Sequence, residues 1–279
     1  MFLAETYLWA YLPWIPLLVM ASWAAIRSKA SFFRLPGGWV APFGFVLLFI
    51  AMSNSQYKLP HYIYIVWPFS AVWLSAWFVR LENKGLPQKV LAALSMVLFA
   101  FSTTVLFHFS QADVWSGSLL TLIFVLLAWF YWKSTDVDLK LFGPVSMAIL
   151  YFGMVANFWF YPLLLTYQAS SEGGKLLQSV PARQACFYFQ LQNESTHALH
   201  FYARRVVPVL TDLTSLQPNK ETFVYTTKSG LESLRAAGLK PLIIKVLPYY
   251  KVTHLSARFL RPSTREETLE KHYILSVSP

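Results

Sequence analysis

Long apolar stretches separated by short polar loops fill the first part of the chain, up to about residue 167. Each stretch is apolar around its whole helical circumference, which is typical of a membrane span and not of an amphipathic helix lying on a surface. A helix needs about 20 mostly apolar residues to cross about 30 Å of hydrocarbon. The pattern predicts six spans: Thr6–Ile26, Trp39–Met52 with its flanking residues, Tyr62–Val79, Val90–Phe107, Ser118–Trp132 and Leu141–Leu165.

The pattern changes after residue 167, where short apolar runs alternate with polar segments. Runs rich in aromatic and β-branched residues favour strands, here at Ala185–Gln190, Thr222–Thr226, Leu242–Val246 and His272–Val277. Helices are predicted at Ser195–Ala203 and at Ser229–Ala237, where Gly238 supplies a C-terminal stop. The chain is therefore predicted to be an α-helical multi-pass membrane bundle over residues 1–167, followed by a small α/β domain over residues 168–279.

The composition supports this division. Charged residues make up only 13% of the chain, whereas soluble domains carry about 25%. The first 167 residues hold nine Lys/Arg and five Asp/Glu, and the remaining 112 hold fourteen and eight. The net charge of the chain is +10. In its first part the basic residues lie in short loops between apolar spans, so no nucleic-acid partner is expected. The single cysteine, Cys186, excludes an intramolecular disulfide and lies in an apolar run typical of a core strand.

The distribution of basic residues over the loops predicts the orientation of the spans. The alternate loops hold only Lys58, and the other set holds eight basic residues: Arg27, Lys29, Arg34, Arg80, Lys84, Lys89, Lys133 and Lys140. Loops rich in Lys and Arg face the cytoplasm. We therefore expect a multi-pass protein of the plasma (inner) membrane, with Lys58 and the α/β domain on the extracytoplasmic side.

One outer loop carries candidate chemistry. The sequence Lys58-Leu-Pro-His61-Tyr62 places a cation, an imidazole and a phenol at the start of the third predicted span, and Pro60 restricts the backbone between them. A cation near the lipid surface beside hydrogen-bond donors suits a lipid phosphate. The alternative interpretation is that Lys58 extends to lipid headgroups while the tyrosines form an interface belt.

The segment Lys-Leu-Pro-His-Tyr-Ile, with Pro68 six residues after Tyr62, resembles the central motif of polyprenyl-phosphate-sugar glycosyltransferases. These GT-C-type membrane enzymes include the aminoarabinose transferases of lipid A and the protein O-mannosyltransferases. Two further stretches resemble the same family: residues 2–14, ending in Leu-Pro-Trp, and His200-Phe-Tyr-Ala-Arg-Arg in the predicted outer domain. The resemblance covers most of this chain but only the C-terminal half of such an enzyme.

The resemblance implies that Lys58 pairs with the phosphate of the lipid carrier and that Tyr62 hydrogen-bonds it, with His61 as a further contact. The family's catalytic acid lies in a first extracytoplasmic loop that has no counterpart here, so the catalytic residue stays unknown. No cofactor is evident, and a divalent metal would enter only with a missing upstream part. The expected partners are membrane lipids, a polyprenyl-phosphate sugar donor and an upstream catalytic half.

Other polar residues favour structural roles. Asp136-Val-Asp138 resembles a metal and nucleotide-sugar motif, but lies on the predicted cytoplasmic side and fits a solvated turn. His197 and His200 can share a helix face, and two histidines do not make a zinc site. Asn157, within the sixth predicted span, is expected to bond a neighbouring helix.

Three functions fit these observations to different degrees. The first is a glycosyltransferase, or its C-terminal half, that moves a sugar from a polyprenyl-phosphate donor to a lipid or protein acceptor at the outer face. The alternative is a truncated, non-catalytic membrane subunit that binds a lipid carrier or a partner protein, since the acidic loop is missing. A transporter would require ionisable residues in mid-span or internal repeats, and the sequence shows neither.

Overall fold

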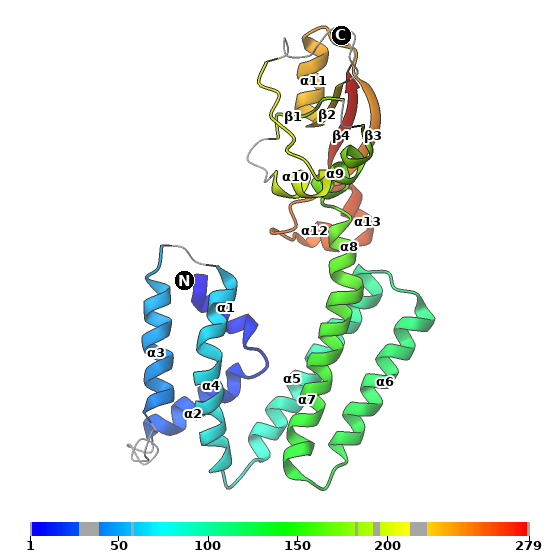
Figure 1. Ribbon diagram of the computed structural model, residues 1–279. Coiled ribbons are helices and arrows are strands. Elements are labelled where there is room, and N and C mark those ends of the chain that lie inside the picture. The colour runs from blue at the N-terminus through cyan, green and yellow to red at the C-terminus, as the bar shows by residue number, and fades with distance from the viewer. Residues whose placement is uncertain are drawn as a thin grey trace. The chain divides into compact units, whose positions relative to one another are not determined.

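The computed structural model describes residues 2–27, 39–56, 59–181, 184–191, 196–212 and 222–277. The chain divides into two compact units, which Figure 1 displays with their elements labelled. The helical unit comprises Met1–Phe101 and Ser118–Phe152, and the sheet unit comprises Ser102–Gly117 and Gly153–Pro279.

Among the described residues of the first 165, every regular element is a helix, and the helices are joined by short turns. The elements are α1 (Phe2–Ala10), α2 (Ile15–Arg27), α3 (Val40–Ser53), the 3-10 helix η1 (Pro60–Val66), α4 (Trp67–Val79), α5 (Gly85–Thr104), the π-helix η2 (Val105–Phe109), α6 (Val114–Trp132), α7 (Val137–Val155), the π-helix η3 (Ala156–Phe160) and α8 (Tyr161–Leu165). Four continuous helices are long and apolar enough to cross a membrane: Pro60–Val79, Gly85–Phe109, Val114–Trp132 and Val137–Leu165. The last four predicted spans are therefore confirmed as helices of membrane-spanning length.

The first two predicted spans differ from expectation. Thr6–Ile26 is not one helix, because α1 and α2 are bent by 107° at a short break. Pro13 lies in that break, and a proline removes a backbone donor and crowds the preceding turn. Helix α3 has only 14 residues, about 21 Å of rise. The described residues thus provide four helices of spanning length, or five if the bent pair counts as one span.

Helix α1 packs on the segment that begins with Pro60. Leu3 and Tyr7 of α1 share a buried cluster with Ile63 and Val66 of η1. The Tyr7 hydroxyl lies 2.7 Å from Oγ of Ser70, so this contact also includes a hydrogen bond. The bend between α1 and α2 therefore lets the first helix line the 3-10 turn that precedes α4.

The sheet unit contains every strand that the sequence predicts. Its further elements are α9 (Ala169–Ser179), β1 (Cys186–Phe189), α10 (His197–Ala203), β2 (Thr222–Thr227), α11 (Lys228–Ala236), β3 (Leu242–Tyr249), α12 (Ala257–Leu260), α13 (Pro262–Arg265), the 3-10 helix η5 (Glu266–Thr268) and β4 (Glu270–Val277). The strand order is β1-β2-β4-β3. β1 is parallel to β2, and β4 is antiparallel to both β2 and β3. The sheet is therefore mixed.

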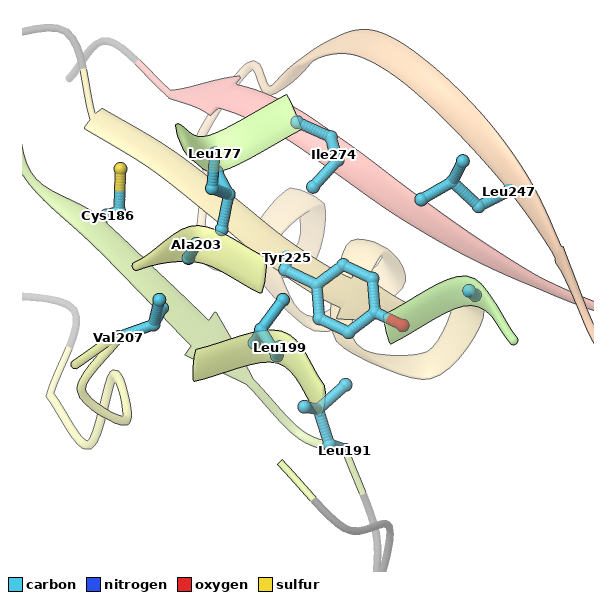
Figure 2. Packing of buried hydrophobic residues seen from close by; sticks show 10 residues of the cluster. Leu177, Cys186, Leu191, Leu199, Ala203, Val207, Tyr225, Leu247 and Ile274 are labelled. Atoms are coloured by element: carbon cyan, nitrogen blue, oxygen red, sulfur yellow. The ribbon is translucent and has the colours of Figure 1, made fainter. Parts of the chain in front are cut away.

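Helices cover both faces of this sheet. Successive strand residues point to opposite faces, and both faces carry apolar side chains that pack on helices. Tyr225 and Ile274 face a cluster that includes Leu177 of α9 and Leu199 of α10. Figure 2 shows the fully buried Tyr225 in the middle of this cluster. The neighbouring strand residues, among them Val224 and Leu275, face the opposite cluster with Leu231 and Leu234 of α11.

Candidate lipid-binding site

The predicted phosphate-binding residues fall around the start of η1. Lys58 lies outside the described residues. His61 is exposed and Tyr62 is half-buried, and both belong to the first turn of η1. Their rings lie 4.9 Å apart at an interplanar angle of 85°. Pro60 occupies the first turn of this helix, where a missing backbone donor costs nothing. The structure thus brings His61 and Tyr62 together.

An apolar groove of about 750 Å³ lies within the helical unit. Its walls come from the α1–α2 turn and α2, from η1 and α4, and from the start of α7. Six aromatic rings line it: Tyr11, Trp14, Tyr64, Trp67, Phe78 and Phe142. A lining of this kind, with few polar groups, suits a long hydrocarbon chain.

One end of the groove is aromatic and adjoins η1. The ring of Trp67 lies 4.4 Å from that of Tyr64 and 6.1 Å from that of Tyr11, measured between centroids. Among the described residues, Nε1 of Trp67 is buried without a hydrogen-bond partner. Tyr64, at this end, belongs to η1, which begins two residues after Lys58 in the chain.

The other end of the groove is ionic. Nζ of Lys84 lies 2.9 Å from Oδ1 of Asp138 and 4.6 Å from the centroid of the Phe78 ring. Asp138 belongs to the Asp136-Val-Asp138 stretch, in which Oδ1 of Asp136 accepts from the backbone N–H groups of Asp138 and Leu139. Asp136 therefore caps the start of α7, and Asp138 pairs with Lys84. The described residues contain no group of three or more His, Cys, Asp or Glu side chains placed to hold a metal ion.

The remaining candidates have structural surroundings. Nδ1 of His200 accepts from the backbone N–H of Val207 at 3.1 Å, which ties α10 to the segment after it. Within the described part of the chain, the hydrogen bond of Asn157 lies in its own helix, whereas the sequence suggested one to a neighbouring helix. Its exposed amide donates to the carbonyl of Gly153 at 2.7 Å, one turn earlier in its own helix. A local backbone acceptor is available to any helical asparagine, and it satisfies this side chain without a partner helix.

Cys186 is a buried core residue, as predicted. Burial raises the pKa of its thiol, and the nearby Arg205 guanidinium opposes this rise without cancelling it. Nη2 of Arg205 lies 2.9 Å from the sulfur. A thiol kept protonated in a core is a poor nucleophile, so Cys186 is structural.

Sequence reasoning missed a buried cation in the sheet unit. Arg265 is only 6% exposed. It donates from Nη2 to the carbonyl of Phe109 at 2.8 Å and from Nε to that of Phe259 at 3.1 Å. Its guanidinium also lies over the Phe109 ring, 4.5 Å from the centroid. The sequence around Arg265 gives no local signal of this, because Phe109 lies far away in the chain.

Apolar helices of spanning length, a small mixed sheet and an apolar groove define an integral membrane protein with a candidate lipid site. No protein-family model matches the chain, and no curated protein matches its sequence. Two solved structures share its fold: ArnT from Cupriavidus metallidurans bound to undecaprenyl phosphate, at a TM-score of 0.56 and 15% identity, and the same protein in the apo state, at 0.56 and 16%. Each match covers 98% of this chain and 51% of ArnT.

These comparisons confirm the resemblance to GT-C enzymes at the level of the fold. The chain spans about half the length of ArnT. The fold likeness is consistent with the C-terminal half that the sequence motifs indicated.

Proposed function

We propose that this chain is the carrier-binding half of a glycosyltransferase that uses a polyprenyl-phosphate sugar at the outer face of the plasma membrane. The observation that carries the proposal is the groove. It is apolar along its length, its aromatic end adjoins η1, and η1 follows Lys58 in the chain. The same fold occurs in ArnT, which has been solved with undecaprenyl phosphate bound.

The chemistry assigns a role to each end of the carrier. Negative charge builds on the phosphate as the glycosidic bond breaks, and a cation there stabilises the transition state. Lys58 supplies this cation, while Tyr62 and His61 donate hydrogen bonds to the phosphate. The tail lies in the groove among its aromatic rings. The acid or base that activates the acceptor, a lipid or a protein, comes from an upstream half, together with any divalent metal.

The proposed topology has six crossings over residues 1–167, with α1–α2 as a broken crossing and α3 as a short one. The loop charges support this, with eight basic residues on one side and one on the other. Residues 168–279 then form an extracytoplasmic domain, on the same side as Lys58.

A titration of the purified chain in nanodiscs with a polyprenyl phosphate tests the proposal. A charge-assisted hydrogen bond contributes about 1.5–3 kcal/mol, so Lys58→Ala should weaken binding roughly ten- to a hundred-fold at low salt. Lys58→Arg should retain part of the affinity because the charge remains. Tyr62→Phe should cost less, since it removes one neutral hydrogen bond.

Lys89→Ala is the matched control, because Lys89 is an exposed lysine on the predicted cytoplasmic side and should leave the affinity unchanged. Equal affinities for wild type and Lys58→Ala would return Lys58 to a role in topology alone.

The second candidate function is a subunit that binds the carrier without chemistry, and the observation that favours it is the apolar groove, which would serve binding alone equally well. Addition of an upstream half of an ArnT-like enzyme distinguishes the two. Release of free polyprenyl phosphate from a sugar-loaded carrier supports the transferase. Carrier binding with no release supports the subunit.

A further inference from the structure

The apolar lining of the groove in the helical unit ends at a pair of charges. Its aromatic end begins at Tyr64, and its other end is the ion pair between Lys84 and Asp138. Both charges keep access to water, with 26% of the Lys84 side chain and 66% of the Asp138 side chain exposed, so an apolar tail gains no further burial by continuing past them. Lys84 is held further by its position over the Phe78 ring. The Lys84–Asp138 pair therefore marks where apolar contact with a tail ends.

Two independent quantities give the capacity of the groove. Fifteen residues separate Tyr64 from Val79, the first and last lining residues of η1 and α4, which at about 1.5 Å per residue is about 22 Å. The volume is about 750 Å³, and a chain carbon fills about as much space as a water molecule, roughly 30 Å³. The groove thus holds about 25 carbons over about 22 Å, or about five isoprenyl units.

The two quantities agree for an isoprenoid chain. Five units along this length leave about 4.5 Å for each, close to the reach of four carbon–carbon bonds of about 1.5 Å in an extended zigzag. Planar alkenes and methyl branches also pack well on aromatic faces, and six rings line the groove. A saturated acyl chain offers no such planar groups. The occupant that fits is the phosphate-proximal part of a polyprenyl tail.

We propose that this groove determines how much of the lipid carrier contributes to binding: it binds about the first five isoprenyl units, and the bound part ends at the Lys84–Asp138 pair. This rests on the proposed function, because it assumes a polyprenyl phosphate whose head lies near Lys58. The remainder of a longer tail leaves the groove and lies in the bilayer. Affinity then depends on chain length only up to about 25 carbons.

The experiment is a competition series in nanodiscs of one fixed lipid composition, with polyprenyl phosphates of ten, fifteen, twenty-five and fifty-five carbons. Packing of three additional units on aromatic rings should raise affinity about tenfold between ten and twenty-five carbons. From twenty-five to fifty-five carbons the change should be less than about twofold. Saturated alkyl phosphates of the same lengths should show a weaker rise.

Two variants shorten the groove by different amounts. Ala71 and Ser75 both line it, one helical turn apart on α4, and a turn of about 5.4 Å matches about one isoprenyl unit. Ala71→Phe should move the plateau to about ten carbons, and Ser75→Phe to about fifteen to twenty. Val72→Phe is the control, because Val72 is 58% exposed on the same helix and does not line the groove. It should leave the plateau where wild type has it.

Each outcome decides something. A plateau whose chain length increases in the order Ala71→Phe, Ser75→Phe, wild type supports a groove that binds a fixed number of isoprenyl units. Binding that rises without a plateau, or a plateau that is the same in all variants, overturns it and leaves the proposed function intact. An equal rise for saturated chains means that the groove holds any lipid tail, which also overturns it. The absence of binding at every length overturns the proposed function itself.

Discussion

Replacement of Arg265 by alanine should destabilise the sheet unit strongly. Arg265 joins parts of this unit that are remote in the chain, because one guanidinium donates to the carbonyls of Phe109 in η2 and Phe259 in α12. Both rings also face the cation, at 4.5 Å and 5.7 Å from its carbon. The substitution removes all four contacts at once and leaves two main-chain acceptors without this donor.

The magnitude follows from these contacts. Hydrogen bonds from a charged donor contribute about 1.5–3 kcal/mol each, and a desolvated cation–π contact adds about 2 kcal/mol. The contacts share one side chain whose burial has its own cost, so the values do not add fully. A loss of about 3–5 kcal/mol is expected for Arg265→Ala. Arg265→Lys should recover less than half, because an ammonium cannot donate to both carbonyls in the same planar geometry.

Thermal unfolding in detergent, combined with limited proteolysis after β3, measures the effect. Arg258→Ala is the matched control: its guanidinium lies 2.9 Å from Glu267, but both side chains are more than 60% exposed. An exposed pair of this kind contributes about 1 kcal/mol or less. If Arg265→Ala unfolds at the same temperature as Arg258→Ala, the buried contacts do not hold the unit together.

Two further predictions concern packing and topology. Gly174→Ala should cost about 1–3 kcal/mol in a thermal unfolding assay, because a Cβ there would lie 2.7 Å from the carbonyl of Leu199. Gly153→Ala, where a Cβ meets nothing within 4 Å, should be neutral or stabilising, and an equal cost in both would contradict the packing argument. Lys240→Cys in a Cys186→Ala background should react with an impermeant maleimide on intact cells. Labelling only after permeabilisation would place the sheet unit in the cytoplasm.

The strands of the sheet unit could be predicted from sequence because their signal is local. Each lies in a short run of aromatic and β-branched residues, and β2 at Thr222–Thr227 differs from its prediction by one residue. Helix α9 gave no such signal. Its sequence contains Gly173 and Gly174, which weaken an isolated helix. These glycines allow α9 to approach Tyr225 and α10 closely, so tertiary packing stabilises the helix where local propensity does not.

The candidate site divides in the same way. The proposed phosphate-binding residues Lys58, His61 and Tyr62 are contiguous in sequence, so a local motif is enough to propose them, and their role stays a prediction. The groove could not be predicted, since its lining comes from segments that are far apart in the chain. Lys84 and Asp138, which end it, are separated by 54 positions. The sequence marked both as ordinary loop charges, and only the fold shows that they pair.

The pairing of Lys84 also bears on the direction in which a carrier lies in the groove. Two lysines flank the η1–α4 segment: Lys58 precedes it and Lys84 follows it. Lys84 is within 2.9 Å of a carboxylate, so its charge is largely compensated and attracts a phosphate weakly. The Ser53–Tyr62 stretch that contains Lys58 holds no acidic residue in its sequence. Under the proposed function, we therefore expect a polyprenyl phosphate to bind with its head at the Lys58 end and its tail toward Lys84. With the proposed topology, this polarity puts the reacting phosphate on the extracytoplasmic side, from which an enzyme of the proposed kind would reach its acceptor.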